Sequence, residues 1–217
     1  VIKGDLIINQ GIKLEIDPGV RVIFEKYSSR SNGIEVNGSL LANGTATSPI
    51  KFTYNSNGIR IPESEYNFKG INITSTGELN GNFINIEFTE GDFNHILNNG
   101  KLTIKDSTIN TIIQGNGNYS TGVFIKSGLT TLIQNTIVSN CLSAFKITDS
   151  IGTVNIYDNN IKNNTIGTSI SNYNISSTGQ ITINGNVFSD NNEGIVIWDK
   201  NSKALSIDIS SNTISKS

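Results

Sequence analysis

A pattern of eight positions recurs five times in the second half of this chain. It reads apolar-x-apolar-x-x-Asn/Ser-x-Ile/Phe, with Thr once in the first place. The Asn or Ser positions are 107, 135, 159, 186 and 212, so successive copies lie 28, 24, 27 and 26 residues apart. A recurrence of this length is typical of stacked-repeat proteins, in which each unit contacts only its neighbours. The fold can therefore be predicted from one unit.

A second pattern, Gly/Ala-apolar-x-apolar, lies between the copies of the first. Its copies in this half of the chain begin at Gly122, Ala144, Gly167 and Gly194. In both patterns apolar residues alternate with mostly polar ones, which predicts strands with one buried face. No stretch has the apolar spacing of an amphipathic helix. Each unit is therefore expected to hold two or three short strands, joined by turns rich in Asn, Gly and Ser.

Short strands that recur in the same order are predicted to wind into a coil, in which equivalent strands of successive units pair in parallel. We expect an all-β, single-domain, right-handed parallel β-helix of about eight or nine coils. The right hand is chosen because connections between parallel strands overwhelmingly take it. The side chains expected to stack as one interior column are Ile104, Leu132, Ile156, Ile183 and Ile209.

Asparagines also recur at fixed places in the repeat. One predicted column contains Asn135, Asn159, Asn186 and Asn212, and a second contains Asn140, Asn164 and Asn191. Asn tolerates left-handed backbone at turns, and amides stacked in register can hydrogen-bond along the coil as a ladder. We therefore predict a structural role for these residues rather than a role in ligand binding.

Threonines suggest two outward columns. These contain Thr103, Thr131 and Thr182 on one strand, and Thr108, Thr136 and Thr213 on another. Regular Thr arrays on a flat β-helix can order water, as ice-binding surfaces do. Other residues interrupt both columns, however, and Thr is a common strand residue in any case. Strand propensity is the preferred explanation.

The composition excludes several classes of function. The 217 residues include 16 basic and 18 acidic side chains, so there is no basic surplus that would indicate nucleic-acid binding. No apolar run has the length of a transmembrane helix. The polar, mostly uncharged composition favours an extracellular or cell-surface protein of bacterial type. Cys141, the single cysteine, provides no disulfide framework and is interpreted as a buried filler. The single histidine, His95, cannot form a zinc site without partners.

The chain divides into two regions of one domain. Residues 1–53, with a Pro-Gly turn, are expected to form N-terminal coils or a cap, and residues 54–217 to form the regular coils. Insertions are expected at 54–69, 114–121 and 172–180. The repeat pattern predicts a further strand after its last copy. We therefore expect a piece of a longer protein, with further domains or an end-to-end contact at the C-terminal coil.

Two N-terminal segments, LEIDPGVRVIF and IEVNGSLLANGTATSPIKFT, and the Asn-x-Ile-x-x-Asn-x-x-Gly-Ile repeat resemble the pectate-lyase-like superfamily of right-handed β-helix proteins, in particular its secreted bacterial members. The resemblance covers essentially the whole chain and implies the fold. Members of this superfamily include lyases, hydrolases, epimerases, adhesins, surface-layer parts and phage tailspikes, so the fold does not choose the function. We expect a module that binds carbohydrate or acts as a structural scaffold. The alternatives are a polysaccharide lyase or related polysaccharide-active enzyme, and a surface-layer or adhesin domain.

The resemblance implies that a lyase would hold calcium with carboxylates from adjacent coils and would use Arg or Lys as the base. The outward columns here contain only scattered acids, so catalytic residues stay unassigned. The densest acidic group, Glu87, Glu90 and Asp92, is a candidate calcium site, although such clusters are more often simply solvated. No other cofactor is expected.

The surface expected to bind a polysaccharide is one outward strand face. Its residues are Phe124, Lys126, Lys146, Thr148, Trp198 and Asp199. The lysines could pair with the carboxylates of a polyuronate, and Trp198 offers a flat apolar plate against which a sugar can stack. The alternative is that neighbouring loops cover the aromatic rings and make them packing residues.

Overall fold

The computed structural model describes residues 1–24, 32–54, 68–89, 94–112, 120–126, 129–149, 152–172, 179–199 and 205–216. These residues form three parallel sheets of eight strands each and contain no helix. Accordingly, this part of the chain has no apolar helix of the length needed to cross a membrane. The insertions predicted at 54–69, 114–121 and 172–180 lie largely outside the described residues.

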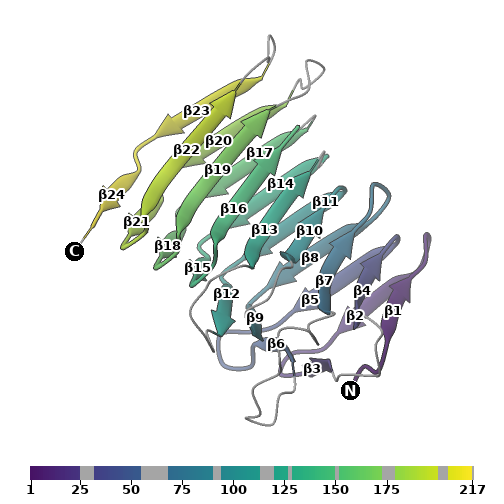
Figure 1. Cartoon of the computed structure of the whole chain (residues 1–217). Coiled ribbons are helices and arrows are strands. Elements are labelled where there is room, and N and C mark those ends of the chain that lie inside the picture. The colour runs from purple at the N-terminus through teal and green to yellow at the C-terminus, as the bar shows by residue number, and fades with distance from the viewer. Residues whose placement is uncertain are drawn as a thin grey trace.

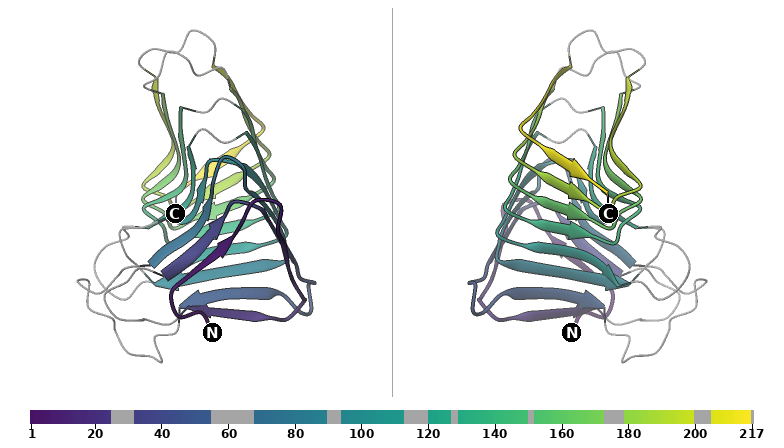
Figure 2. Two further views of the ribbon diagram at one scale, coloured as in Figure 1. Left: turned by 90° about the vertical axis from the view of Figure 1, so that its right-hand side faces the viewer. Right: turned by 90° about the vertical axis from the view of Figure 1, so that its left-hand side faces the viewer.

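Consecutive strands enter the three sheets in turn, so the chain winds as a coil and the strands stack in order from the N-terminal to the C-terminal end (Figure 1). Viewed along the stack, the sheets enclose a roughly triangular interior (Figure 2). Each strand pairs in parallel with the equivalent strands of the neighbouring coils. The protein is therefore a parallel β-helix, as the repeat predicts, and it is consistent with right-handed winding.

We label the three sheets A, B and C and define each by its strands. Sheet B consists of β1 (Asp5–Ile8), β4 (Asn32–Val36), β7 (Phe68–Ile73), β10 (Asn94–Asn98), β13 (Thr121–Lys126), β16 (Ser143–Thr148), β19 (Ile166–Asn172) and β22 (Glu193–Asp199). Sheet C consists of β2 (Lys13–Ile16), β5 (Ser39–Asn43), β8 (Glu78–Asn82), β11 (Lys101–Lys105), β14 (Thr130–Gln134), β17 (Thr153–Tyr157), β20 (Gln180–Asn184) and β23 (Ser206–Ser210). Sheet A consists of β3 (Arg21–Phe24), β6 (Ile50–Tyr54), β9 (Ile84–Thr89), β12 (Thr108–Ile112), β15 (Ile137–Ser139), β18 (Asn160–Lys162), β21 (Val187–Ser189) and β24 (Thr213–Ser215).

Inward side chains of all three sheets fill the interior, and most of them are Ile, Val, Leu or Phe. One interior column of sheet C contains Ile104, Ile133, Ile156, Ile183 and Ile209. The predicted column had Leu132 in the second place, which is wrong by one residue. Ile133 is fully buried, whereas Leu132 faces outward and is half-buried. Both residues are aliphatic, so alternation within this strand could not choose between them.

The shift of one residue extends through the rest of the repeat that contains Leu132. Asn135 is exposed. Its φ is positive, and Asp106 and Asp158 also have a positive φ at the same turn of the coils before and after it. Asn140 likewise has a positive φ, at the turn where Asn163 occupies the same place one coil later. Both asparagines therefore form turns by adopting left-handed backbone. They do not belong to the ladder columns predicted for them, where Thr136 and Cys141 take their places.

The other asparagines of the first column form the predicted ladder at the turn between sheets C and A. The Oδ1 atom of Asn186 accepts hydrogen bonds from the main-chain N–H and from Nδ2 of Asn159, both at 2.9 Å. Asn212 accepts the same two bonds from Asn186, again at 2.9 Å. Each amide thus satisfies a main-chain N–H of the preceding coil that sheet pairing leaves without a partner.

A second ladder lies at the turn between sheets A and B. Asn191 Oδ1 accepts hydrogen bonds from the main-chain N–H of Asn164 at 2.9 Å and from its Nδ2 at 3.0 Å. Asn164 Oδ1 accepts one from the main-chain N–H of Cys141 at 2.9 Å. The structural interpretation of the recurrent asparagines is confirmed for these residues.

The predicted threonine columns do not form. Thr131 and Thr136 are buried and face inward, so they cannot contribute to an outer surface. Thr103 pairs with Leu132, and Thr108 pairs with Ile137. The same one-residue shift breaks both columns, because side chains one position apart point to opposite faces of a strand.

Candidate functional site

Five of the six predicted carbohydrate-binding residues, Phe124, Lys126, Lys146, Thr148 and Trp198, lie on the outer side of sheet B, where strand pairing sets them in two rows along the stack. The first row contains Phe124, Lys146, Ser169 and Val196. The second row contains Lys126, Thr148, Ser171 and Trp198. We call these two rows the sheet B face. Asp199 follows Trp198 on β22, and its backbone pairs with that of Asn172.

Phe124 and Lys146 occupy neighbouring positions of the first row, so their side chains meet. The Nζ atom of Lys146 lies 4.9 Å from the centroid of the Phe124 ring. This is a cation–π geometry, and it holds the ammonium group over the ring. Both side chains are half-buried, whereas Lys126 in the second row is exposed.

Leu97 of β10 precedes Phe124 in the first row and extends its apolar surface. The sequence analysis missed this residue. Its strand lacks the Gly or Ala that opens the equivalent strands and has His95 in that place. The Gly/Ala-apolar-x-apolar pattern therefore does not match this strand. The alternation of Ile96, Leu97 and Asn98 is a weaker signal, from which the outward position of Leu97 could have been predicted.

Hydroxyl groups form the middle of the sheet B face. Thr148, Ser169 and Ser171 face outward, yet their exposed fractions are only 9%, 4% and 5%. In the second row, Thr148 and Ser171 lie between Lys126 at one end and Trp198 at the other, and both hydroxyl side chains are largely buried.

Trp198 is 48% exposed, which makes it one of the most exposed large apolar side chains among the described residues. Trp198 and Lys126 are separated by three strand spacings along the second row. At about 4.8 Å per spacing this is about 14 Å, so only an extended ligand could contact both.

The structure does not gather the predicted calcium ligands into a described site. Glu87 lies on β9 in sheet A, away from the sheet B face, while Glu90 and Asp92 lie outside the described residues. Within the described ranges no group of three His, Cys, Asp or Glu side chains could hold a metal ion. A catalytic arrangement is therefore not assigned.

A polar cluster that the sequence analysis did not find is buried at the corner between sheets A and B. Thr111 is at its centre: its Oγ1 lies 2.7 Å from Ser120 Oγ, 3.4 Å from His95 Nε2 and 3.4 Å from Cys141 Sγ. All four side chains are essentially inaccessible to solvent. We call these four residues the His95 cluster. His95 stands where β4, β7, β13, β16, β19 and β22 have Gly or Ala, and that departure from the pattern is the signal that could have revealed it.

Burial changes the acid–base properties of two members of the cluster. Desolvation lowers the pKa of His95 from 6.5 to about 3. Desolvation also raises the pKa of the Cys141 thiol to about 12, against the opposing effect of its hydrogen bond with Thr111. Both groups are therefore neutral at physiological pH. A neutral, inaccessible thiol is a poor nucleophile, so the cluster lacks the properties of a Cys–His catalytic pair.

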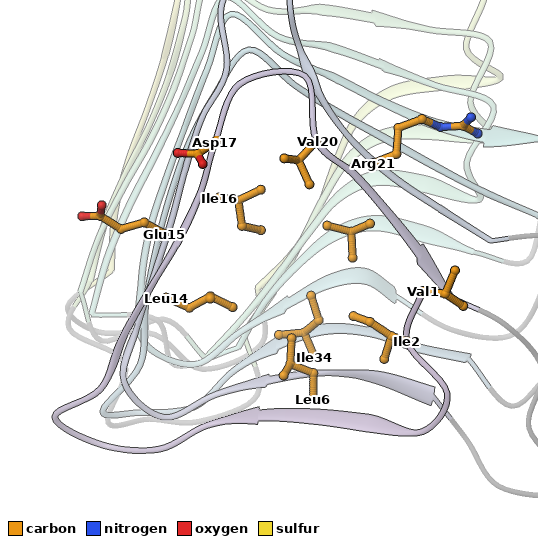
Figure 3. Close-up of a pocket in the computed structure, with 11 residues that line it drawn as sticks. Val1, Ile2, Leu6, Leu14, Glu15, Ile16, Asp17, Val20, Arg21 and Ile34 are labelled. Carbon is orange, nitrogen blue, oxygen red and sulfur yellow. The ribbon is translucent and has the colours of Figure 1, made fainter.

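An apolar pocket of about 330 Å³ lies far from the sheet B face, at the N-terminal end of the coil. Leu6, Leu14, Ile16 and Ile34 point into it, whereas the Glu15 carboxylate points outward (Figure 3). It forms because β1, β2 and β3 are the first strands of their sheets, so their inward side chains are covered on one side only. The pocket is the open end of the interior rather than a depression in a sheet.

Comparison of the chain with protein-family models finds no match. Comparisons with curated proteins and with solved structures also find no match.

Proposed function

We propose that this chain is an extracellular or cell-surface β-helix module that binds an extended glycan along the sheet B face. The proposal relies on one observation above all: a half-exposed Trp198 stands in register with Ser171, Thr148 and Lys126 in a single row. The resemblance to secreted members of the pectate-lyase-like superfamily supports the location.

The chemistry of the two rows suits sugar recognition. An aromatic ring offers a flat apolar surface for the C–H side of a sugar ring, and indole N–H can still bond to a polar group. Serine and threonine hydroxyls both donate and accept hydrogen bonds, which matches the hydroxyls of a glycan. Lys126 and Lys146 add two cations beside these groups. A glycan that runs parallel to the coil axis along the second row would pass Lys126 at one end and Trp198 at the other.

The coil supplies a rigid support for such a surface. The two asparagine ladders and the continuous interior hold successive strands in fixed register, so that side chains in a row keep their spacing. A scaffold role and a binding role are therefore compatible within one module.

The test is a glycan array with the intact chain, followed by calorimetry with a glycan that binds. Trp198→Ala should weaken binding by about 1–3 kcal/mol, which is typical of losing an aromatic anchor. The matched control is Tyr157→Ala, since Tyr157 is a half-buried aromatic residue on the outer side of sheet C. The control should leave the affinity unchanged.

Two results would contradict the proposal. One is an unchanged affinity of Trp198→Ala together with a large drop in its thermal stability, which would make Trp198 a packing residue. The other is turnover: incubation with uronate polymers and calcium, followed by a rise in absorbance from new double bonds, would instead establish the polysaccharide lyase.

A further inference from the structure

A small polar pocket of about 30 Å³ lies near the N-terminal end of sheet B. Its lining comes from β1, β4 and β7, and consists of Asp5, Gly33, Ile34, Glu35, Lys69 and Asn72. We call it the Asn72 pocket. In the first row of the outer side of sheet B, Asn72 is followed by Leu97 and then by Phe124. The pocket is therefore continuous with the sheet B face.

The Asn72 pocket exists because β7 contains one extra residue. The register between β4 and β7 shifts just before Gly33, and Lys69 is left without a pairing partner on β4. Bulges of this kind re-aim a side chain and are common beside functional sites. A Cβ atom at Gly33 would lie 2.8 Å from the Gly70 carbonyl oxygen and 2.9 Å from Lys69 Cβ. Because Gly33 has no side chain, Lys69 reaches across it, and its Nζ lies 3.1 Å from Asp5 Oδ2 on β1.

Oxygen acceptors dominate the lining of the pocket. Among the described residues, Asn72 Oδ1 is inaccessible to solvent and has no hydrogen-bond partner. Glu35 pairs with Asn72 across the two strands and accepts a hydrogen bond from Asn37 Nδ2 at 2.9 Å. The lining carries the two carboxylates of Asp5 and Glu35 and the single ammonium of Lys69, which leaves one net negative charge. An unpaired buried acceptor is costly, so the pocket favours a group that donates hydrogen bonds and is positively charged.

We propose that the Asn72 pocket is a subsite for the primary ammonium group of an amino sugar. An ammonium group has three donors, enough for Asn72 Oδ1 and the carboxylates of Glu35 and Asp5. It is also about the size of a water molecule, which a pocket of this volume holds.

This inference rests on the proposed glycan-binding function, because continuity with the sheet B face is the reason to expect a sugar rather than a lysine side chain of a protein. The cations of that face do not oppose a bound ammonium. Lys126, on β13, is three strand spacings from Glu35, on β4. This is about 14 Å, which exceeds the Debye length of about 8 Å at physiological ionic strength.

The test compares two sugars that differ in one group. Methyl β-glucosaminide has an ammonium where methyl β-glucoside has a hydroxyl. Each is titrated into the intact chain at pH 6, and NMR follows the side-chain amide of Asn72 and the main-chain N–H of Gly33. Both signals should shift and saturate, with a dissociation constant about five- to tenfold lower for the glucosaminide. The factor is modest because the charged groups of Asp5 and Lys69 are partly exposed.

Glu35→Gln tests which charge sets this preference. The substitution keeps the shape of the side chain and removes its charge, so the preference for the glucosaminide should fall to less than about twofold. The matched control is Glu78→Gln on β8 of sheet C. Glu78 likewise accepts a hydrogen bond from the asparagine two residues later, Asn80, at 3.0 Å. The control should keep the full preference.

Equal affinities for the two sugars in the wild-type chain would overturn the inference, and this comparison needs no variant to fold. An undiminished preference in Glu35→Gln would overturn it as well. So would tighter binding of Nα-acetyl-lysinamide than of the glucosaminide at the same NMR signals, because that result would indicate a protein partner.

The failure of this inference is distinguishable from the failure of the proposed function. Trp198, on β22, is six strand spacings from Glu35, or about 29 Å, so one sugar residue cannot contact both. Trp198→Ala should therefore leave the preference for the glucosaminide unchanged. Glycan-array binding that is lost in Trp198→Ala, together with no glucosaminide preference in the wild type, would contradict the subsite alone.

Discussion

Asn186 is the residue whose removal should most clearly separate ladder asparagines from turn asparagines. It is fully buried, and its side chain connects three successive coils. Its Oδ1 accepts two hydrogen bonds from Asn159, and its Nδ2 donates to the main-chain oxygen of Ile156 at 2.8 Å and to Asn212 Oδ1 at 2.9 Å. Asn186→Ala removes these bonds together.

The size of the effect follows from what the substitution leaves behind. Each lost hydrogen bond contributes about 1 kcal/mol net, and a buried donor left without a partner costs about 1–3 kcal/mol. The main-chain N–H of Asn159 is the donor most affected, since its described acceptor is Asn186 Oδ1. We expect Asn186→Ala to lower the free energy of unfolding by about 3 kcal/mol.

The matched control is Asn135→Gly. Asn135 has φ 49° and is exposed, so glycine can adopt the same backbone without strain. Its side chain does donate a hydrogen bond to Asp106, but at an exposed position, and the loss should stay within about 0.5 kcal/mol. Asn186→Ser should recover part of the loss, because Ser107 in the same column accepts a bond from the main-chain N–H of Ile84 at 3.1 Å.

Urea unfolding followed by circular dichroism measures all three variants. The decisive quantity is the difference between Asn186→Ala and Asn135→Gly, because both remove an asparagine from the repeat. Equal losses would refute the reasoning, since they would mean that the ladder contributes no more than an exposed turn amide.

Three further substitutions test the register and the interior. Ile133→Ala should lower the free energy of unfolding by about 2–5 kcal/mol and Leu132→Ala by less than about 1 kcal/mol, because only Ile133 is buried in the interior column. Chemical denaturation measures both, and a reversed order would restore the register predicted from the sequence. Thr168 faces the interior, is fully buried, and its Oγ1 has no hydrogen-bond partner among the described residues. Thr168→Val should therefore raise the unfolding free energy by about 1 kcal/mol, and a lower melting temperature by calorimetry would show that the hydroxyl is satisfied.

Much of the candidate site could be predicted from the sequence, because alternation within a strand already separates outward from inward positions. It correctly placed Phe124, Lys146 and Trp198 outside. It could not show that Lys146 lies over the Phe124 ring, since that contact depends on which residues of two strands stand opposite each other.

The buried cluster shows a different limit. His95 is the single histidine of the chain, and nothing in its local sequence brings it near Thr111 or Cys141. Those residues are 16 and 46 positions away and meet at one corner because the coil returns there once in each turn. Contacts of this kind between successive coils can be predicted only when the length of every intervening coil is known.

The sequence by itself determined the parallel β-helix, because a repeated alternation of short strands has few other ways to bury its apolar faces. It also determined the ladder roles of Asn159, Asn186 and Asn212. Tertiary structure alone decided the second copy of the pattern, where Thr131 and Ile133, rather than Leu132, face the interior. The reason is physical: side chains alternate with period two, so a slip of one residue exchanges the two faces, and only pairing with β11 and β17 fixes which face is buried.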